Sequence, residues 1–384
     1  MRSEQISDAM GMLPDEVIEE TDEIRDGRRK LGKKYPMPLL RLLPAAACLV
    51  LFVGVVIKLN HNRADDAAAT DLPILSVSFA EESSYGFEGL MAYDISELVN
   101  ANPRSENLKL DTLPVYKNKL ELEDFVPVGF DKEYVRNQLI DVAARLGIDE
   151  SELGNIEEEA EMCTMTLETD KYIIRADASG DVRITFANPE TLPESVVFNF
   201  ESSYEDCEKA ADYFKEQYKD VLKMDLPVAN IHDGDYDIYG YRSYDLSFYD
   251  GKGDIVEQLI NYNFRQVKFA PDSENGLSFI DICCPDLSEK VGDYPIISAD
   301  EAKALLKSGE YYTSVPYDMP GVEYVAKVEP VYRTGILETY FMPFYKFYVE
   351  LPEEAEHNDL GLKTYGAYYV PAVEGRYLKQ NVSK

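Results

Sequence analysis

One apolar run near the N-terminus constrains this 384-residue chain more than any other feature. No charged residue occurs among the sixteen positions from Leu42 to Ile57, and the run covers 39–59 if the flanking Arg41 and Lys58 are included. A helix of that length spans ~31 Å at ~1.5 Å per residue, about one hydrocarbon core, with both cations reaching the interfaces. The run therefore predicts a transmembrane helix over 39–59.

The charges beside this run predict its orientation. Cations cluster before it, and only Lys58 and Arg63 follow it before the acidic region begins. The preceding cations are Arg25, Arg28, Arg29, Lys30, Lys33, Lys34 and Arg41. Because positive charge favours the cytoplasmic side, we expect residues 1–36 in the cytoplasm and the chain after a polar linker, 60–72, outside the cell membrane.

Three alternatives to this single-pass signal-anchor are a buried core helix, a cleaved signal peptide and a lipoprotein. A core helix would not explain the flanking cations. The small residues 67–69 come too late after the apolar run for signal-peptide cleavage. Further apolar residues follow Cys48, where a lipoprotein's apolar segment should end.

The composition narrows the class of protein. The formal net charge is −34, from 72 acidic and 38 basic residues, and such a surface repels phosphate backbones, so no nucleic-acid partner is expected. Apolar residues make up 45% of the chain, which excludes a wholly disordered protein. Five cysteines are too few for a disulfide-rich scaffold.

Residues 1–36 are too short for a domain with its own core, but they carry an apolar stripe at helical spacing on both sides of Pro14. Acidic residues cover the remaining faces. Two short amphipathic helices cannot bury such a stripe alone, so we expect this segment to dock into a groove of a cytoplasmic partner. The alternative is a weakly ordered tail. The expected partner-binding residues are Met10, Leu13, Val17, Ile18 and Ile24.

The stretch ISDAMGMLPDEVIEETDEIR, followed by the basic run and the apolar segment, resembles a layout of membrane-anchored regulators of sigma factors in clostridial-type Gram-positive bacteria. The resemblance covers roughly the first 60 residues and implies a sigma factor as the cytoplasmic regulator. A kinase is the other regulator that we consider. Residues 1–36 contain neither His nor Cys, so they depart from the commoner zinc-binding anti-sigma domain.

The region after the linker repeats one order of elements, a helix followed by strands. Helices are predicted over 131–147, with Asp131 as the N-cap, and over 298–309, with a capping box formed by Ser298 and Glu301. A second capping box, Ser202 with Glu205, predicts that a further helix begins there, between the other two in the sequence. Strands are predicted at 160–169, 171–177, 181–187, 236–249, 255–269, 277–284, 323–333, 340–351 and 363–373.

This order predicts an α+β fold in which a transmembrane helix precedes repeated helix-plus-antiparallel-sheet units. The expected units are 73–192, 193–290 and 291–384, with Pro343 at a sheet edge. They resemble PepSY-like (cystatin-like) extracytoplasmic modules in order and size. The last unit, beginning YPIISADEAKALL, resembles a recurring tail of uncharacterised clostridial-type membrane-anchored proteins. These resemblances imply binding or regulation of an envelope protein or peptide.

Residues for catalysis are sparse, and we predict no catalytic, cofactor-binding or metal-ligating residue and no cofactor. His61 and His357 are expected in solvent, and His232 begins HDGDYD, whose acids suit an ordinary polar turn better than a calcium loop. Paired carboxylates for glycoside hydrolysis stay open, because sequence alone contains no distances.

Cysteines and tyrosines have structural interpretations with one alternative each. Cys163, Cys207 and Cys284 fall in phase with apolar neighbours and are expected in cores, whereas Cys283 faces the other way and could be a reactive thiol or a disulfide partner. In the predicted strand at 340–349, both faces carry aromatic residues. One face should be buried in the core, so the other needs a cover or a binding partner.

The leading functional prediction is a non-enzymatic, membrane-anchored sensor or regulator that couples an envelope ligand or partner to a cytoplasmic regulator. The alternatives are an anchored envelope hydrolase that uses paired carboxylates and a PepSY-like protease inhibitor. A patterned segment on each side of one apolar helix favours the sensor.

Overall fold

The computed structural model describes residues 72–77, 92–93, 98–104, 110–123, 126–236, 242–313, 315, 318–355 and 363–379. They belong to one compact unit, Asp71–Lys384. Helices and antiparallel sheets combine in it, which confirms an α+β fold. The expected cytoplasmic segment and transmembrane helix lie outside the described residues. Among the helices that are described, none has the length and apolar character needed to cross a membrane.

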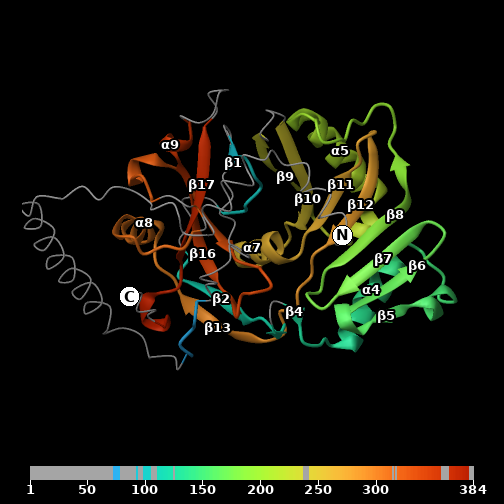
Figure 1. Ribbon diagram of the computed structural model, residues 1–384, viewed down its shortest axis with the longest axis horizontal. Coiled ribbons are helices and arrows are strands. Elements are labelled where there is room, and N and C mark those ends of the chain that lie inside the picture. Colours follow the sequence, from blue (N-terminus) through green and yellow to red (C-terminus); the bar gives the residue numbers. More distant parts are fainter. Residues whose placement is uncertain are drawn as a thin grey trace, which may run out of the picture. The chain divides into compact units, whose positions relative to one another are not determined.

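A 12-stranded sheet contains most of the described strands (Figure 1). The two-residue strand β1 (Ala92–Tyr93) divides this sheet, since it pairs with β17 on one side and meets β9 at a single position on the other. The larger half runs from β1 through β9 (Pro227–Tyr236), β10 (Arg242–Asp250), β11 (Val267–Pro271), β12 (Gly276–Ile282), β8 (Val182–Thr191), β7 (Tyr172–Asp177), β6 (Thr164–Glu168) and β5 (Glu157–Glu159). The smaller half runs from β1 through β17 (Thr364–Pro371), β16 (Pro343–Glu350) and β14 (Val325–Tyr332).

Helices α4 (Lys132–Arg145) and α5 (Tyr204–Gln217) pack on the larger half, α4 against β6, β7 and β8 and α5 against β9 and β10. The predicted helix at 131–147 is confirmed. The Asp131 side chain accepts hydrogen bonds from the amides of Glu133 and Tyr134, which satisfies two donors of the first turn. Val135 and Leu139 are buried in the core cluster, so the apolar stripe faces the sheet as expected.

The capping box predicted at Ser202 and Glu205 is wrong by one residue. Ser203 is the N-cap of α5, and its hydroxyl accepts the amide of Asp206, whose carboxylate bonds back to the amide and hydroxyl of Ser203. The Ser202 hydroxyl instead accepts the Asn199 amide in the preceding turn. Ser202 and Ser203 each have an acidic residue three positions later, so the sequence allowed a capping box at either serine. The box forms at Ser203.

The strand predicted over 255–269 is wrong in its first part, where the chain forms helix α7 (Ile255–Phe264). The Asp254 side chain caps this helix by accepting the amides of Val256 and Glu257. Short apolar runs are ambiguous between strand and helix, and here the cap at Asp254 decided for the helix. Residues 267–271 do form β11, as expected for the end of that run.

The smaller half of the sheet packs between a helix and a second sheet. Helix α8 (Ala299–Ser308) has the predicted capping box of Ser298 and Glu301 and ends at Gly309. The second sheet has three strands in the order β13 (Lys290–Pro295), β2 (Thr112–Lys117) and β15 (Tyr340–Phe341). A two-stranded sheet joins β3 (Leu122–Glu123) to β4 (Val126–Pro127). Short helices α6 (Lys219–Leu222) and α9 (Pro352–Ala355) and 3-10 turns at Glu152–Asn155, Ala160–Met162, Val322–Tyr324 and Gly375–Tyr377 complete the described elements.

The prediction that Pro343 marks an edge strand is wrong. Strand β16 lies between β14 and β17, and the edges of the 12-stranded sheet are β14 and β5. Pro343 is tolerated because it is the first residue of β16, a position that proline takes within sheets, and its carbonyl still accepts the Ala372 amide. The division into units 73–192, 193–290 and 291–384 stays a prediction.

Residues 72–77, which we call the strap, attach the start of the fold to its C-terminal end. The Leu75 amide donates to the Tyr377 carbonyl at 2.8 Å, and the Lys379 amide donates to the Leu75 carbonyl at 2.7 Å. The Tyr294 hydroxyl of β13 donates to the Pro73 carbonyl at 2.9 Å. Leu75 is 0% exposed and shares a core cluster with Val115 of β2. The strap is therefore fixed to both β2 and β13.

Candidate functional site

Two chain segments lead from the three-stranded sheet to the larger half of the 12-stranded sheet. One follows β2 and reaches α4, and the other leaves β12 and reaches β13. Their described residues, 118–123, 126–131 and 283–289, are called the crossing below. The two segments meet because β2 and β13 pair in antiparallel register, with the Lys117 amide donating to the Glu289 carbonyl at 3.0 Å. The crossing is therefore one of the connections between the two regions.

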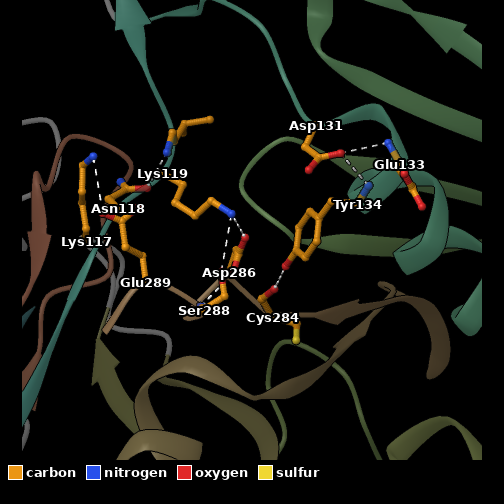
Figure 2. Close-up of polar contacts among 11 residues, drawn as sticks. Lys117, Asn118, Lys119, Asp131, Glu133, Tyr134, Cys284, Asp286, Ser288 and Glu289 are labelled. Carbon is orange, nitrogen blue, oxygen red and sulfur yellow. Dashed lines mark hydrogen bonds and ion pairs between the residues drawn. The ribbon is translucent and has the colours of Figure 1, made fainter. Parts of the chain in front are cut away.

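One polar contact joins the two segments of the crossing through side chains. The Lys119 ammonium donates to the Asp286 carboxylate at 2.6 Å and lies 3.5 Å from the Ser288 hydroxyl (Figure 2). Burial alone would raise the pKa of Asp286, but hydrogen bonds from Lys119 and Ser288 offset this and hold the pKa below its usual value. The two side chains are 44% and 23% exposed, so the pair stabilises the crossing by about 1 kcal/mol at most.

A second contact ties the crossing to α4 and to the β7–β8 turn. The Tyr134 hydroxyl donates to the Cys284 carbonyl at 2.7 Å, as Figure 2 shows, and burial raises the pKa of Tyr134 well above its usual value, so the donor stays protonated. Gly180, in the turn between β7 and β8, approaches the same carbonyl with a φ of +93°. A Cβ atom there would lie 2.4 Å from the Cys284 oxygen and 2.9 Å from the Tyr134 hydroxyl oxygen. Three segments thus converge on one backbone carbonyl.

Replacing Gly180 by alanine tests how tightly the crossing is packed. We expect a loss of about 2–4 kcal/mol in the free energy of unfolding, because the left-handed backbone and the clash with the Cys284 carbonyl both add cost. Gly309→Ala is the matched control. Gly309 has a similar φ of +87° but no atom within 4 Å of the added Cβ, so it should lose about 1–2 kcal/mol. Equal losses in denaturant unfolding would show that the crossing is loosely packed.

A small cavity opens beside these contacts. Its volume is about 100 Å³, well below the ~300–1,000 Å³ of ordinary small-molecule sites. The lining residues come from both segments of the crossing, from α4 and from the β7–β8 turn: Asn118, Lys119, Leu120, Gly129, Phe130, Asp131, Tyr134, Ala178, Ser179, Pro285 and Asp286. A cavity of this size would not hold an ordinary small-molecule ligand. Because the crossing connects two parts of the fold, we call this connection the joint.

Helix α7 is the apolar part of this joint. It contacts β10 in the larger half and β14 in the smaller half. Phe264 packs edge-on against Tyr332 with ring centroids 5.1 Å apart, and its ring lies 5.4 Å from that of Phe341. The Asn263 side chain accepts the Tyr332 amide at 2.9 Å. These contacts bind the two halves of the sheet through one helix.

The segment 98–104 contacts both halves as well. The Ala101 amide donates to the Asn230 side chain of β9 at 2.8 Å, and the Tyr249 hydroxyl of β10 donates to the Ala101 carbonyl at 2.8 Å. Towards the smaller half, Asn100 donates to the buried Glu329 carboxylate and Asn102 donates to the Pro330 carbonyl of β14. This segment thus connects β9 and β10 to β14. It does so beside β1, the strand through which the two halves share only a few backbone pairs.

The described cysteines are free thiols in structural positions. Cys163 and Cys207 are buried, as their phase predicted, and burial raises the pKa of Cys207 to about 12. Cys283 is partly buried, and this burial, with the nearby Asp181 carboxylate, raises its pKa to about 12. A thiol with such a pKa is protonated at neutral pH, which disfavours the reactive-thiol interpretation of Cys283. Cys284 is half-buried beyond the end of β12.

The aromatic alternation at 340–349 is explained by cover on both faces. Tyr345 and Phe347 lie in the cluster that contains α8 residues, and Phe344 lies in the cluster that contains the strap and β2. Phe344, Tyr345 and Phe347 are therefore covered within the fold. His232 also differs from expectation, because it lies in β9 and not in a polar turn. The described residues contain no group of three side chains able to hold a metal ion.

The residues predicted to bind a cytoplasmic partner, Met10, Leu13, Val17, Ile18 and Ile24, lie outside the described residues, as do His61 and His357. The sequence analysis missed Lys119, Tyr134 and Asp286, which form no motif and meet only in the fold.

No family model matches this sequence, and the curated proteins include none with significant similarity to it.

Proposed function

We propose that this chain is a membrane-anchored regulatory protein without catalytic activity, whose extracytoplasmic part binds an envelope ligand or partner and controls a cytoplasmic regulator. The apolar run 39–59 would span the membrane once, with residues 1–36 in the cytoplasm. A sigma factor or a kinase would be the regulator that the stripe of residues 1–36 contacts.

The strap is the observation that best supports this proposal. It begins at the last residue of the linker 60–72, and it is hydrogen-bonded to Tyr294 of β13 and to residues 377 and 379. A protein that transmits a displacement through this point needs such a fixed attachment.

The contacts define a continuous route from the joint to the linker. The crossing leads directly into β2 and β13, and both strands contact the strap, β2 through Val115 and β13 through Tyr294. Leu72 packs over Gly292 of β13, where a Cβ would lie 2.5 Å from its side chain. Movement between the regions that meet at the crossing would displace β2 and β13, then the strap, then the membrane segment.

Photo-crosslinking in living cells tests the cytoplasmic end of this proposal. Crosslinkers at Met10, Val17 and Ile24 should each capture one discrete sigma factor or kinase. Val17→Asp with Ile24→Asp should abolish the capture by the crosslinker at Met10, because a charge on the stripe opposes docking in an apolar groove. A crosslinker at Glu20, on the acidic side, is the control and should capture far less.

The proposal fails if nothing is captured while the protein is present and correctly inserted. That result would leave the extracytoplasmic part to act alone, as the protease-inhibitor alternative requires.

A further inference from the structure

The strap is held by a short segment that follows β17, residues 374–379, which we call the clasp. Leu75 of the strap and Leu378 of the clasp form a parallel bridge. The Leu75 amide donates to the Tyr377 carbonyl, and the Lys379 amide donates to the Leu75 carbonyl. The two segments come from opposite ends of the described chain, so the fold itself brings them together.

The Tyr377 side chain makes a second, indirect connection to the strap. Its ring packs edge-on against Tyr294 of β13, with ring centroids 5.5 Å apart and planes at 88°. Tyr294 is 0% exposed, and its hydroxyl donates to the Pro73 carbonyl at 2.9 Å. Because a tyrosine hydroxyl lies at the end of a rigid ring, packing that fixes the ring also directs the hydroxyl. Tyr377 therefore helps to aim the Tyr294 hydroxyl at the strap.

The clasp is itself attached to β13. The Glu374 amide donates to the Pro295 carbonyl at 3.0 Å, and the Tyr377 amide donates to the Glu374 carbonyl at 3.0 Å. The Arg376 guanidinium lies 2.9 Å from the Glu374 carboxylate and 4.9 Å from the ring centre of Tyr377. The clasp is thus fixed to β13 at Glu374 and reaches the strap at Tyr377.

Tyr377 acts on the strap at two positions. Its carbonyl accepts the Leu75 amide, and its ring supports the hydroxyl that is bonded to Pro73. The packing of the strap has a separate source, since Val115 of β2 is 0% exposed in the core cluster that contains Leu75. Loss of the Tyr377 ring should therefore weaken the hydrogen bonds of the strap more than its packing on β2.

We propose that Tyr377 is a positioning residue for the strap, acting through Tyr294, and that the clasp thereby sets where the chain leaves the fold towards the linker. The region after β17 would then act on the linker through this pair of rings, by a route separate from the crossing. The effect on the cytoplasmic segment rests on the proposed function, whereas the hold of the clasp on the strap does not.

Hydrogen exchange of the full-length protein in lipid nanodiscs tests this role. Tyr377→Ala should speed the exchange of the Leu75 and Lys379 amides about tenfold, because loss of the aromatic contact favours local opening of the bridge. Tyr294→Phe keeps both rings and removes only the hydroxyl bonded to Pro73, so it should speed the exchange of Leu75 by about fivefold.

Two control variants separate positioning from a general loss of stability. Tyr377→Phe keeps the ring and should exchange as the wild type does. Tyr324→Ala removes a tyrosine that is 36% exposed in the 3-10 turn before β14, and it should leave the Leu75 and Lys379 amides unchanged. Exchange in β12 should be the same in all of these proteins.

The role of Tyr377 is overturned if Tyr377→Ala leaves the exchange of Leu75 unchanged, or speeds exchange equally in β12. Should Tyr377→Ala fail to fold, Tyr294→Phe decides, since unchanged exchange of Leu75 in that variant excludes the aimed hydroxyl. The crosslink yield at Val17 is a separate readout. Faster exchange of Leu75 in Tyr377→Ala without a change in that yield would support the positioning role and contradict the proposed function alone.

Discussion

Phe264→Ala should lower the free energy of unfolding by about 3–5 kcal/mol, one of the largest single-residue effects expected in this fold. The ring is 1% exposed and lies in the cluster that joins α7 to the smaller half of the sheet. It contacts the rings of Tyr332, Phe341 and Tyr116 at centroid distances of 5.1, 5.4 and 6.4 Å. These neighbours come from three different strands, so they could not collapse together to fill the space.

Denaturant unfolding of the wild type and the variant measures this loss. Phe200→Ala is the control, because Phe200 is 59% exposed and its removal should change the free energy of unfolding by less than about 0.5 kcal/mol. A loss below about 1 kcal/mol for Phe264→Ala would contradict the assignment of α7 as the apolar joint.

Local signals in the sequence predicted the parts of the fold that depend on local contacts. The helices at 131–147 and 298–309 were predicted because a side-chain cap, an apolar stripe and a terminating glycine agree in each case. Where two local signals competed, the prediction failed. The apolar run after Asp254 suits a strand or a helix, and the adjacent serines 202 and 203 each suit a cap.

The candidate site could not be predicted because its residues are distant in sequence and form no motif. Lys119 and Asp286 are 167 positions apart, and Tyr134 reaches a carbonyl 150 positions away. Their meeting depends on the pairing of β2 with β13, which no local pattern determines. The strands β2 and β13 were themselves missed, since each carries a proline or glycine that weakens the strand pattern.

Leu75→Asp should detach the strap, with a loss of about 3–5 kcal/mol for the contacts that hold it. Leu75 is 0% exposed, and its backbone is bonded to residues 377 and 379, so a carboxylate there could be hydrated only if the strap leaves its site. Limited proteolysis should cut the variant within 60–77, while exchange in β16 stays slow because α8 and β17 still cover that strand. Ile74→Asp is the matched control, since the neighbouring Ile74 is 58% exposed.

The central claim is that the extracytoplasmic fold controls the cytoplasmic segment through the strap, and the yield of the crosslink at Val17 in living cells tests it most directly. Wild type and Ile74→Asp should give the same yield with the cytoplasmic regulator, and Leu75→Asp should change that yield several-fold although its substitution lies beyond the apolar run from Val17. Equal yields in all three proteins, with the strap shown by proteolysis to be released in Leu75→Asp, would contradict the claim and reduce the first 72 residues to an anchor.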